Sequence, residues 1–265
     1  MKILLEGACN ARDLGGIVCK TGAVQSGRLF RSGELSRLTP NDAEQLQKLG
    51  LHRVVDLRTS KEMENAPDVV IDNVEYMNVS IIRATTFGIT YEKSTGEEIA
   101  KLLQAGFERM KARDESHNQH MNLLYRKFVQ DDFSRKGYGE FLRLLAEKPT
   151  TGATLWHCSA GKDRVGTCTA LLLFCLGASK EQIFEDYMLT NQQSAESRAS
   201  ILNKVKPFVS QENLQIVEEM LSVKESYLQD FFSQIALQFG TVENFLRDCG
   251  VTEEHVCLLR KNYLN

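Results

Sequence analysis

The stretch from residue 153 to residue 176 constrains the fold of this chain more than any other part. Ala153–His157 is a short run that suits a buried strand, and Thr167–Leu176 is an apolar helical pattern. The loop between them opens at Cys158 and contains Gly161 and Gly166. A strand, a glycine-containing loop and a helix in this order predict one unit of an α/β fold.

The rest of the chain repeats this alternation of strand and helix patterns. The strand candidates are Ile17–Cys19 and Ala23–Val24 around a hairpin turn, Arg28–Arg31, Arg53–Leu57 and Val74–Val79. The helix candidates are a segment from Thr39–Pro40 to Leu49, the region from Glu97 to Lys148, and helices that start at Ser179 and Thr252. We therefore expect an α/β fold with a largely parallel central sheet flanked by helices. No linker or repeat divides the 265 residues, so we expect a single domain.

Composition excludes several classes of protein. A formal charge of −3 gives no general attraction for nucleic acid. The longest apolar run, Ala170–Leu176, is too short for an integral membrane segment, and Glu6 ends the N-terminal apolar run too early for a signal peptide. The seven cysteines include no CxxC pair, which argues against a disulfide framework and a zinc cluster. We expect a cytoplasmic protein, with secretion by another route left open.

The loop after Ala153–His157 carries the chemistry that we expect of this chain. Its backbone N–H groups, from Ser159 to Arg164, can converge with those of the helix N-terminus to form a cradle for an anion. The residues expected to bind phosphate in this way are Ser159, Ala160, Gly161, Lys162, Asp163 and Arg164. The glycines permit the backbone angles that such a cradle requires.

Two side chains of the loop then acquire specific roles. Cys158 lies at the floor of the cradle, where the helix dipole and nearby cations favour the nucleophilic thiolate. Arg164 can grip two phosphate oxygens at once. In-line attack by the sulfur would give a phosphocysteine intermediate that water then hydrolyses. The structural alternative is a buried cysteine in a polar turn.

The loop resembles the active-site loop of the protein tyrosine phosphatase superfamily, and its Gly161–Arg164 end resembles a bacterial branch of tyrosine and dual-specificity phosphatases. Further motifs of that branch have similar counterparts at Asn10–Gly16, Leu29–Gly33, Asp56–Arg58, Asp186–Asn191, Tyr227–Leu228 and Phe239–Gly250. The resemblance implies a tyrosine-phosphatase-like fold without a metal or other cofactor. It also implies phosphorylated proteins, and in some members phosphoinositides, as substrates. Helices between about 196 and 223 are implied to cover the active site.

The leaving group needs a proton, so a carboxylic acid must stand near the loop. Asp56 ends a predicted parallel strand, where active sites of open α/β sheets gather, and the resemblance also assigns it this role. An ion pair with Arg58 is the structural alternative. Asp163, inside the loop, is the second candidate for the proton donor.

Several residues near the loop are expected to support it. His157 is expected to hydrogen-bond the loop backbone and tune the cysteine. Lys162 is either a second cation at the rim, which would favour substrates with several phosphates, or a solvated surface lysine. Arg12, Arg31 and Arg58 either line the pocket or satisfy buried carbonyl or carboxylate groups, and we favour the second, structural interpretation.

One position departs from the superfamily pattern. The residue after the arginine is usually Ser or Thr, whose hydroxyl assists hydrolysis of the intermediate, whereas this chain has Val165. Ser159 or Thr167 could compensate. We therefore expect a competent first step and slow turnover.

Three functions remain open at this stage. The first is a phosphatase for phosphotyrosine, phosphoserine, phosphothreonine or phosphoinositides. The second is a weakly catalytic module that recognises phosphate, and Val165 keeps this reading open. The third is sulfur transfer or arsenate reduction, which also use a reactive cysteine in an oxyanion loop.

Overall fold

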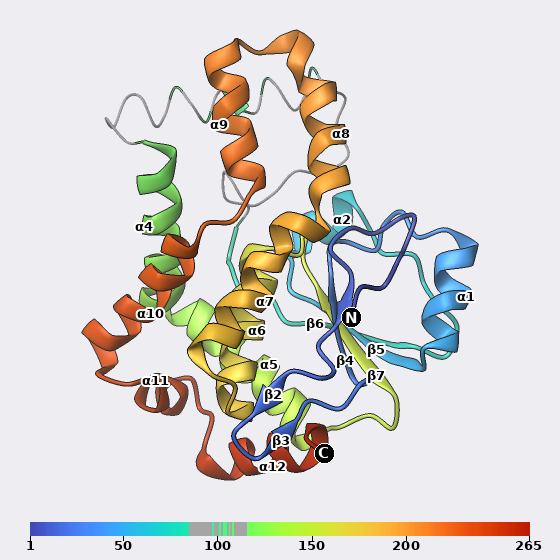
Figure 1. The fold of residues 1–265 in the computed structure, drawn as a ribbon, viewed down its shortest axis with the longest axis vertical. Coiled ribbons are helices and arrows are strands. Elements are labelled where there is room, and N and C mark those ends of the chain that lie inside the picture. The colour runs from blue at the N-terminus through green and yellow to red at the C-terminus, as the bar shows by residue number, and fades with distance from the viewer. Residues whose placement is uncertain (85–96, 98–100, 102, 105, 107, 109–115) are drawn as a thin grey trace.

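A five-stranded sheet organises the protein (Figure 1). The structure is a computed structural model and describes residues 1–84, 97, 101, 103, 104, 106, 108 and 116–265. The strand order is β1-β4-β7-β5-β6; β4, β7, β5 and β6 run parallel, and β1 pairs antiparallel with β4. The strands are β1 (Arg12–Asp13), β4 (Leu29–Ser32), β5 (Leu51–Asp56), β6 (Glu75–Asn78) and β7 (Ala153–His157), with a separate hairpin of β2 (Val18–Cys19) and β3 (Gly22–Ala23).

The sheet is buried on both faces, because successive side chains of its central strands enter different cores. Leu155 and Val54 belong to a core with the N-terminal segment and α1 (Pro40–Lys48). Trp156 and Val55 belong to a larger core on the other face, formed mainly by helices. Those helices include α4 (His117–Gln130), α5 (Asp132–Glu147), α6 (Asp163–Leu176), α7 (Lys180–Gln193), α10 (Glu225–Phe239), α11 (Val242–Asp248) and α12 (Glu253–Tyr263).

Helix starts follow local capping chemistry. Thr39 caps α1 in a capping box with Asp42, and Ser179 and Thr252 form capping boxes at α7 and α12. A further capping box, Thr59 with Glu62, opens the short helix α2 (Ser60–Asn65) beside the sheet.

The expected fold class and strands are confirmed, including the hairpin of β2 and β3. The expected helical region from Glu97 to Lys148 is confirmed from α4 onward, and much of its earlier part lies outside the described residues. The helix expected to start at Thr167 in fact starts at Asp163. The chain makes a tight turn at Gly161, where φ is positive. The loop is therefore short, and Asp163 and the residues after it already form the first turn of α6.

Two helices stand apart from the sheet, at the top of Figure 1. They are α8 (Ala195–Val205) and α9 (Gln211–Leu221), joined through the short 3₁₀ turn Lys206–Phe208. Val205, Val217 and Met220 give this pair a small hydrophobic cluster separate from the two main cores. Among the described residues, no helix has the length and apolar character needed to cross a membrane.

Candidate active site

Three strand ends meet at one edge of the sheet. Ser32 and Asp56 both lie opposite His157 in the parallel register, so the segments that follow β4, β5 and β7 emerge side by side. Cys158 is the first residue after β7. The carboxyl edge of the sheet thus brings the cysteine loop together with the residues after Ser32 and Asp56.

The cysteine loop turns its carbonyl oxygens outward, toward donors on neighbouring segments. The Ser159 carbonyl accepts a hydrogen bond from the Glu34 amide at 3.1 Å, and the Gly161 carbonyl accepts one from the Asn10 side chain at 2.7 Å. An anion cradle has its N–H groups on the inner side of the loop, and these two carbonyl contacts on the outer side fit that arrangement.

Glycine is required at position 161 for two reasons. The residue has a φ of +67°, and a Cβ there would lie 2.5 Å from the backbone carbonyl group of Ser32. A side chain would therefore be strained and would push the loop away from β4. This close approach is what seats the loop on the sheet edge.

A buried network of charged side chains connects the loop to α7 and the sheet. Asp186 on α7 accepts from Arg12 at 2.9 Å and pairs with Arg31, whose other nitrogen donates to the Gly161 carbonyl at 3.0 Å. Arg12 also donates to the Asn10 side chain. Burial would raise the pKa of Asp186, but the two guanidinium groups outweigh it and lower that pKa. Arg12 and Arg31 thus satisfy a buried carboxylate and a buried carbonyl group, which confirms the structural role that we favoured from the sequence.

Arg164 is held by a second buried carboxylate. Its two terminal nitrogens lie 2.8 and 2.7 Å from the two oxygens of Glu62, and neither side chain is exposed. The Ser159 hydroxyl donates to the same carboxylate at 2.9 Å. Burial would lower the pKa of Arg164, but nearby Cys158 and Glu62 raise it, so the guanidinium remains charged beside the sulfur.

Glu62 is ionised because of these contacts. Burial would raise its pKa, but Arg164 above all, with Thr59 and Ser159, lowers it to about 2. The carboxylate thus joins α2 to the loop at both Ser159 and Arg164. Its position fixes the plane of the guanidinium before any phosphate arrives.

Asp56 stands at the end of β5, tied to Arg58. Its oxygens accept hydrogen bonds from the backbone and guanidinium of Arg58 at 2.7 to 3.0 Å, and Arg58 also reaches Asp68 at 2.9 Å. His157 lies 2.8 Å from Asp68 and 3.8 Å from Asp56. Burial would lower the pKa of His157, but the two carboxylates raise it.

This arrangement corrects one expectation and confirms another. Among the described residues, the carboxylate nearest the His157 ring is Asp68, at ion-pair distance, and neither ring nitrogen hydrogen-bonds the loop backbone. Arg58 satisfies buried carboxylates, as expected. Asp56, Asp68 and His157 lie close enough to hold a metal ion, but Arg58 already supplies the positive charge that their carboxylates bind.

Lys162 takes neither position expected from the sequence. Its side chain is only 2% exposed, and its ammonium lies 2.9 Å from the Asp163 carboxylate. It is therefore neither a rim cation nor a solvated surface lysine, because the early start of α6 turns residues 162 and 163 into the protein. Asp163 itself is 1% exposed and also accepts from Tyr125.

The hydroxyl groups that could replace the one missing at Val165 are already engaged. Val165 is fully buried in the larger core. The Thr167 hydroxyl donates back to the carbonyls of Asp163 and Arg164 at 3.1 and 3.2 Å, and Ser159 donates to Glu62. Neither geometry directs a hydroxyl proton to Cys158.

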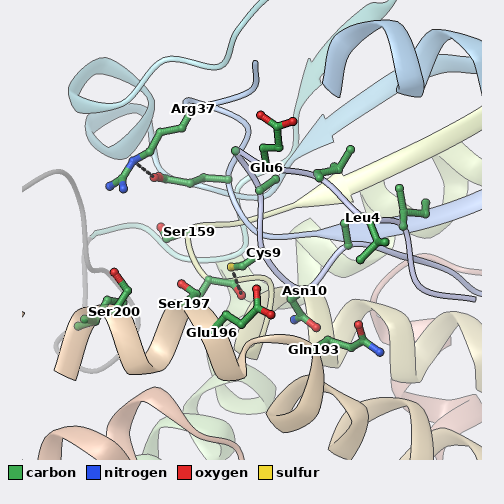
Figure 2. Close-up of a pocket in the computed structure, with 18 of the residues that line it drawn as sticks. Leu4, Glu6, Cys9, Asn10, Arg37, Ser159, Gln193, Glu196, Ser197 and Ser200 are labelled. Atoms are coloured by element: carbon green, nitrogen blue, oxygen red, sulfur yellow. Dashed lines mark hydrogen bonds and ion pairs between the residues drawn. The ribbon is translucent and has the colours of Figure 1, made fainter. Parts of the chain in front are cut away.

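A cavity of about 470 Å³ lies beside the loop. Figure 2 shows Cys9 and Ser159 on its loop side and Ser197 and Ser200 of α8 across from them. Ser159 and Ala160 are the loop residues that line the cavity, whereas Cys158 is only 2% exposed and is not among its lining residues. Helix α8 therefore lines the same cavity as the start of the cysteine loop.

The sequence profile described as the tyrosine phosphatase family matches residues 3–265, nearly the whole chain. The chain belongs to this family. It is a phosphatase, with 30% identity to a candidate tyrosine-protein phosphatase of Cupriavidus necator over 96% of this chain and 85% of that one. It is also 28% identical to the triple specificity protein phosphatase PtpB of Mycobacterium tuberculosis, over 97% and 96% of the two chains. A tyrosine-protein phosphatase of Nostoc commune is 28% identical over 65% of this chain and 51% of its own length.

Several supporting residues of this phosphatase were missed in the sequence. Glu62, Asp68 and Tyr125 each contact a loop residue or its neighbour from a distant position in the chain. Glu62 did leave a local signal, because Thr59 and Glu62 have the spacing of a capping box. That signal predicts a helix start and says nothing of the second contact with Arg164.

Proposed function

We propose that this protein-tyrosine phosphatase acts through Cys158 as nucleophile and Arg164 as phosphate clamp. The thiolate attacks phosphorus, the bond from phosphorus to the leaving oxygen breaks, and the phosphoryl group stays on sulfur until water displaces it. The observation that carries the proposal is the loop itself, with outward carbonyls around Cys158 and a guanidinium fixed by Glu62.

The loop amides, from Ser159 to Arg164, are proposed to bind the equatorial phosphate oxygens. Asp56 is proposed as the proton donor to the leaving oxygen. It lies at the carboxyl end of β5 and is among the charges that act on Arg164. In this structure both of its oxygens accept hydrogen bonds from Arg58, so donation to the leaving oxygen requires that bound substrate draws Arg58 away.

Phosphotyrosine in proteins is the proposed first substrate. The same chemistry would hydrolyse phosphoserine, phosphothreonine or a phosphoinositide that reaches the loop, and PtpB is described as having triple specificity. Because Lys162 is paired with Asp163 inside the protein, a second cation at the rim no longer supports a preference for several phosphates. We therefore rank phosphoinositides below phosphotyrosine.

We also propose that α8 and α9 form a cover over the site within a single domain of residues 1–265. Their separate hydrophobic cluster and the place of α8 on the cavity wall support this reading. A cytoplasmic location is proposed as well, because a reducing setting keeps the thiol of Cys158 reactive, and all seven cysteines are free.

Hydrolysis of a small aryl phosphate tests the proposal. Cys158→Ser should abolish activity, while Cys257→Ser, a matched change at an exposed cysteine of α12, should leave the rate unchanged. Activity that survives Cys158→Ser would eliminate the thiol mechanism. Absence of activity in the wild type, together with tight binding of phosphotyrosine peptides, would favour the recognition module.

A further inference from the structure

The end of the loop is anchored in the protein by an ion pair that the catalytic steps above do not use. The Lys162 ammonium lies 2.9 and 3.2 Å from the two oxygens of Asp163, and both side chains are at most 2% exposed. Both residues directly precede Arg164. Any shift of this pair would therefore move the clamp.

Tyr125 completes this anchor from another helix. Its hydroxyl lies 2.8 Å from Asp163 Oδ1 and 2.7 Å from the hydroxyl of Tyr187. A hydroxyl carries one proton, and an ionised carboxylate only accepts. Because Tyr125 donates to Asp163, Tyr187 must donate to Tyr125. The result is a directed chain of hydrogen bonds from α7 through α4 to the first turn of α6.

The two hydroxyls are fixed as neutral donors. Burial, and then the charge of Asp163, raise the pKa of both Tyr125 and Tyr187 well above the usual range. Neither loses its proton at any working pH. The Tyr187 ring also packs so closely on α6 that a Cβ at Gly166 would lie 2.9 Å from it. The donors are therefore held in place by packing as well as by their hydrogen bonds.

We propose that Tyr125 is a positioning residue of the phosphatase, which holds the Asp163 carboxylate and, through it, the Lys162 ammonium and the end of the loop. This inference rests on the proposed function of the loop. It assigns Asp163 to the support of the loop and leaves proton donation to Asp56. The Asp163 carboxylate is 1% exposed and accepts hydrogen bonds from Tyr125 of α4 and from Lys162, so its oxygens are engaged in this support.

A double-mutant cycle tests this inference. Tyr125→Phe, Asp163→Asn and the double variant are compared by kcat and KM for an aryl phosphate and by competitive inhibition by inorganic phosphate. Tyr125→Phe should lower kcat and weaken phosphate inhibition, each about tenfold, as expected for one lost hydrogen bond to a charged group. In the Asp163→Asn background, Tyr125→Phe should cause no further loss, because the tyrosine acts through that carboxylate.

Tyr138→Phe is the matched control. Tyr138 is as buried as Tyr125 and donates to Thr167 of the same helix at 3.0 Å, without a contact to Asp163. It should lower the melting temperature but leave kcat and phosphate inhibition unchanged. If Asp163→Asn does not fold, Lys162→Gln takes its place in the cycle. That substitution removes the ammonium group that pairs with the Asp163 carboxylate.

Two results would overturn the inference. One is a Tyr125→Phe enzyme with wild-type kcat and phosphate inhibition. The other is a double variant whose losses are the product of the two single losses, which would indicate independent, purely structural effects. Either result leaves the role of Cys158 intact, because that role fails only if Cys158→Ser retains activity.

Discussion

Replacement of Glu62 by glutamine removes a charge and little volume. In the folded protein the carboxylate accepts from both terminal nitrogens of Arg164, from the Ser159 hydroxyl, and from the amide and hydroxyl of Thr59. Every one of these partners is a donor. The amide nitrogen that glutamine introduces would face a donor, and Arg164 would lose its counter-charge.

The expected loss of stability can be worked out in two ways. Removing one partner of a buried ion pair costs about 3–5 kcal/mol. Independently, the difference between the usual pKa of 4.5 and the value of about 2 for Glu62 corresponds to roughly 3 kcal/mol. The free energy of unfolding of Glu62→Gln should therefore fall by about 3 kcal/mol. With a urea slope of about 3 kcal/mol/M, the midpoint shifts by about 1 M.

The assay is urea unfolding followed by fluorescence of Trp156, the single and fully buried tryptophan. Glu64→Gln, an exposed change in the same helix, is the control. We also expect kcat/KM of Glu62→Gln to fall about 100-fold, because a misplaced clamp no longer matches the phosphate.

The pH dependence gives a second check with a definite sign. Folding lowers the pKa of Glu62, so its contribution is fully present above about pH 4.5 and is lost as the pH falls toward about 2. The stability gap between wild type and Glu62→Gln should therefore close in acid. A gap below about 0.5 kcal/mol at neutral pH, the usual size for a surface change, would refute the reasoning.

Three further predictions concern the chemistry. Wild-type enzyme should show a pre-steady-state burst of product followed by a slow phase, in which the intermediate is hydrolysed. Val165→Ser should speed this slow phase, because it supplies a hydroxyl at the position after Arg164. A slow phase unchanged by this substitution would contradict the role given to Val165. Asp56→Asn should abolish the fall in rate on the alkaline side of the pH–rate profile, because a proton donor fails once it is ionised. Asp163→Asn should lower the rate without changing the shape of that profile. The opposite pattern would reverse the two assignments. Chelators should leave activity unchanged, because Arg58 neutralises the Asp56 cluster; a loss restored by a divalent metal would show otherwise.

Local signals in the sequence were sufficient for most of the fold. The strand Ala153–His157 has the predicted bounds, and Thr39 caps α1 where the hydroxyl and proline pattern indicated. These features depend on residues within a few positions of one another. The parallel sheet followed from the alternation of such segments.

The support of the active site could not be predicted in the same way. Glu62 meets Arg164 across 102 positions, and Tyr125 meets Asp163 across 38, so no local pattern links the partners. The burial of Lys162 was missed for a related reason. It depends on where α6 begins, which the turn at Gly161 and its contact with β4 decide.

The central claim is that phosphate passes through the sulfur of Cys158. Rapid acid quench of the enzyme with an aryl phosphate, followed by mass spectrometry of its peptides, tests this directly. We expect a transient phosphoryl group on the peptide that contains Cys158. Product formation without any phosphorylated peptide, or with the phosphoryl group on another residue, would contradict the account.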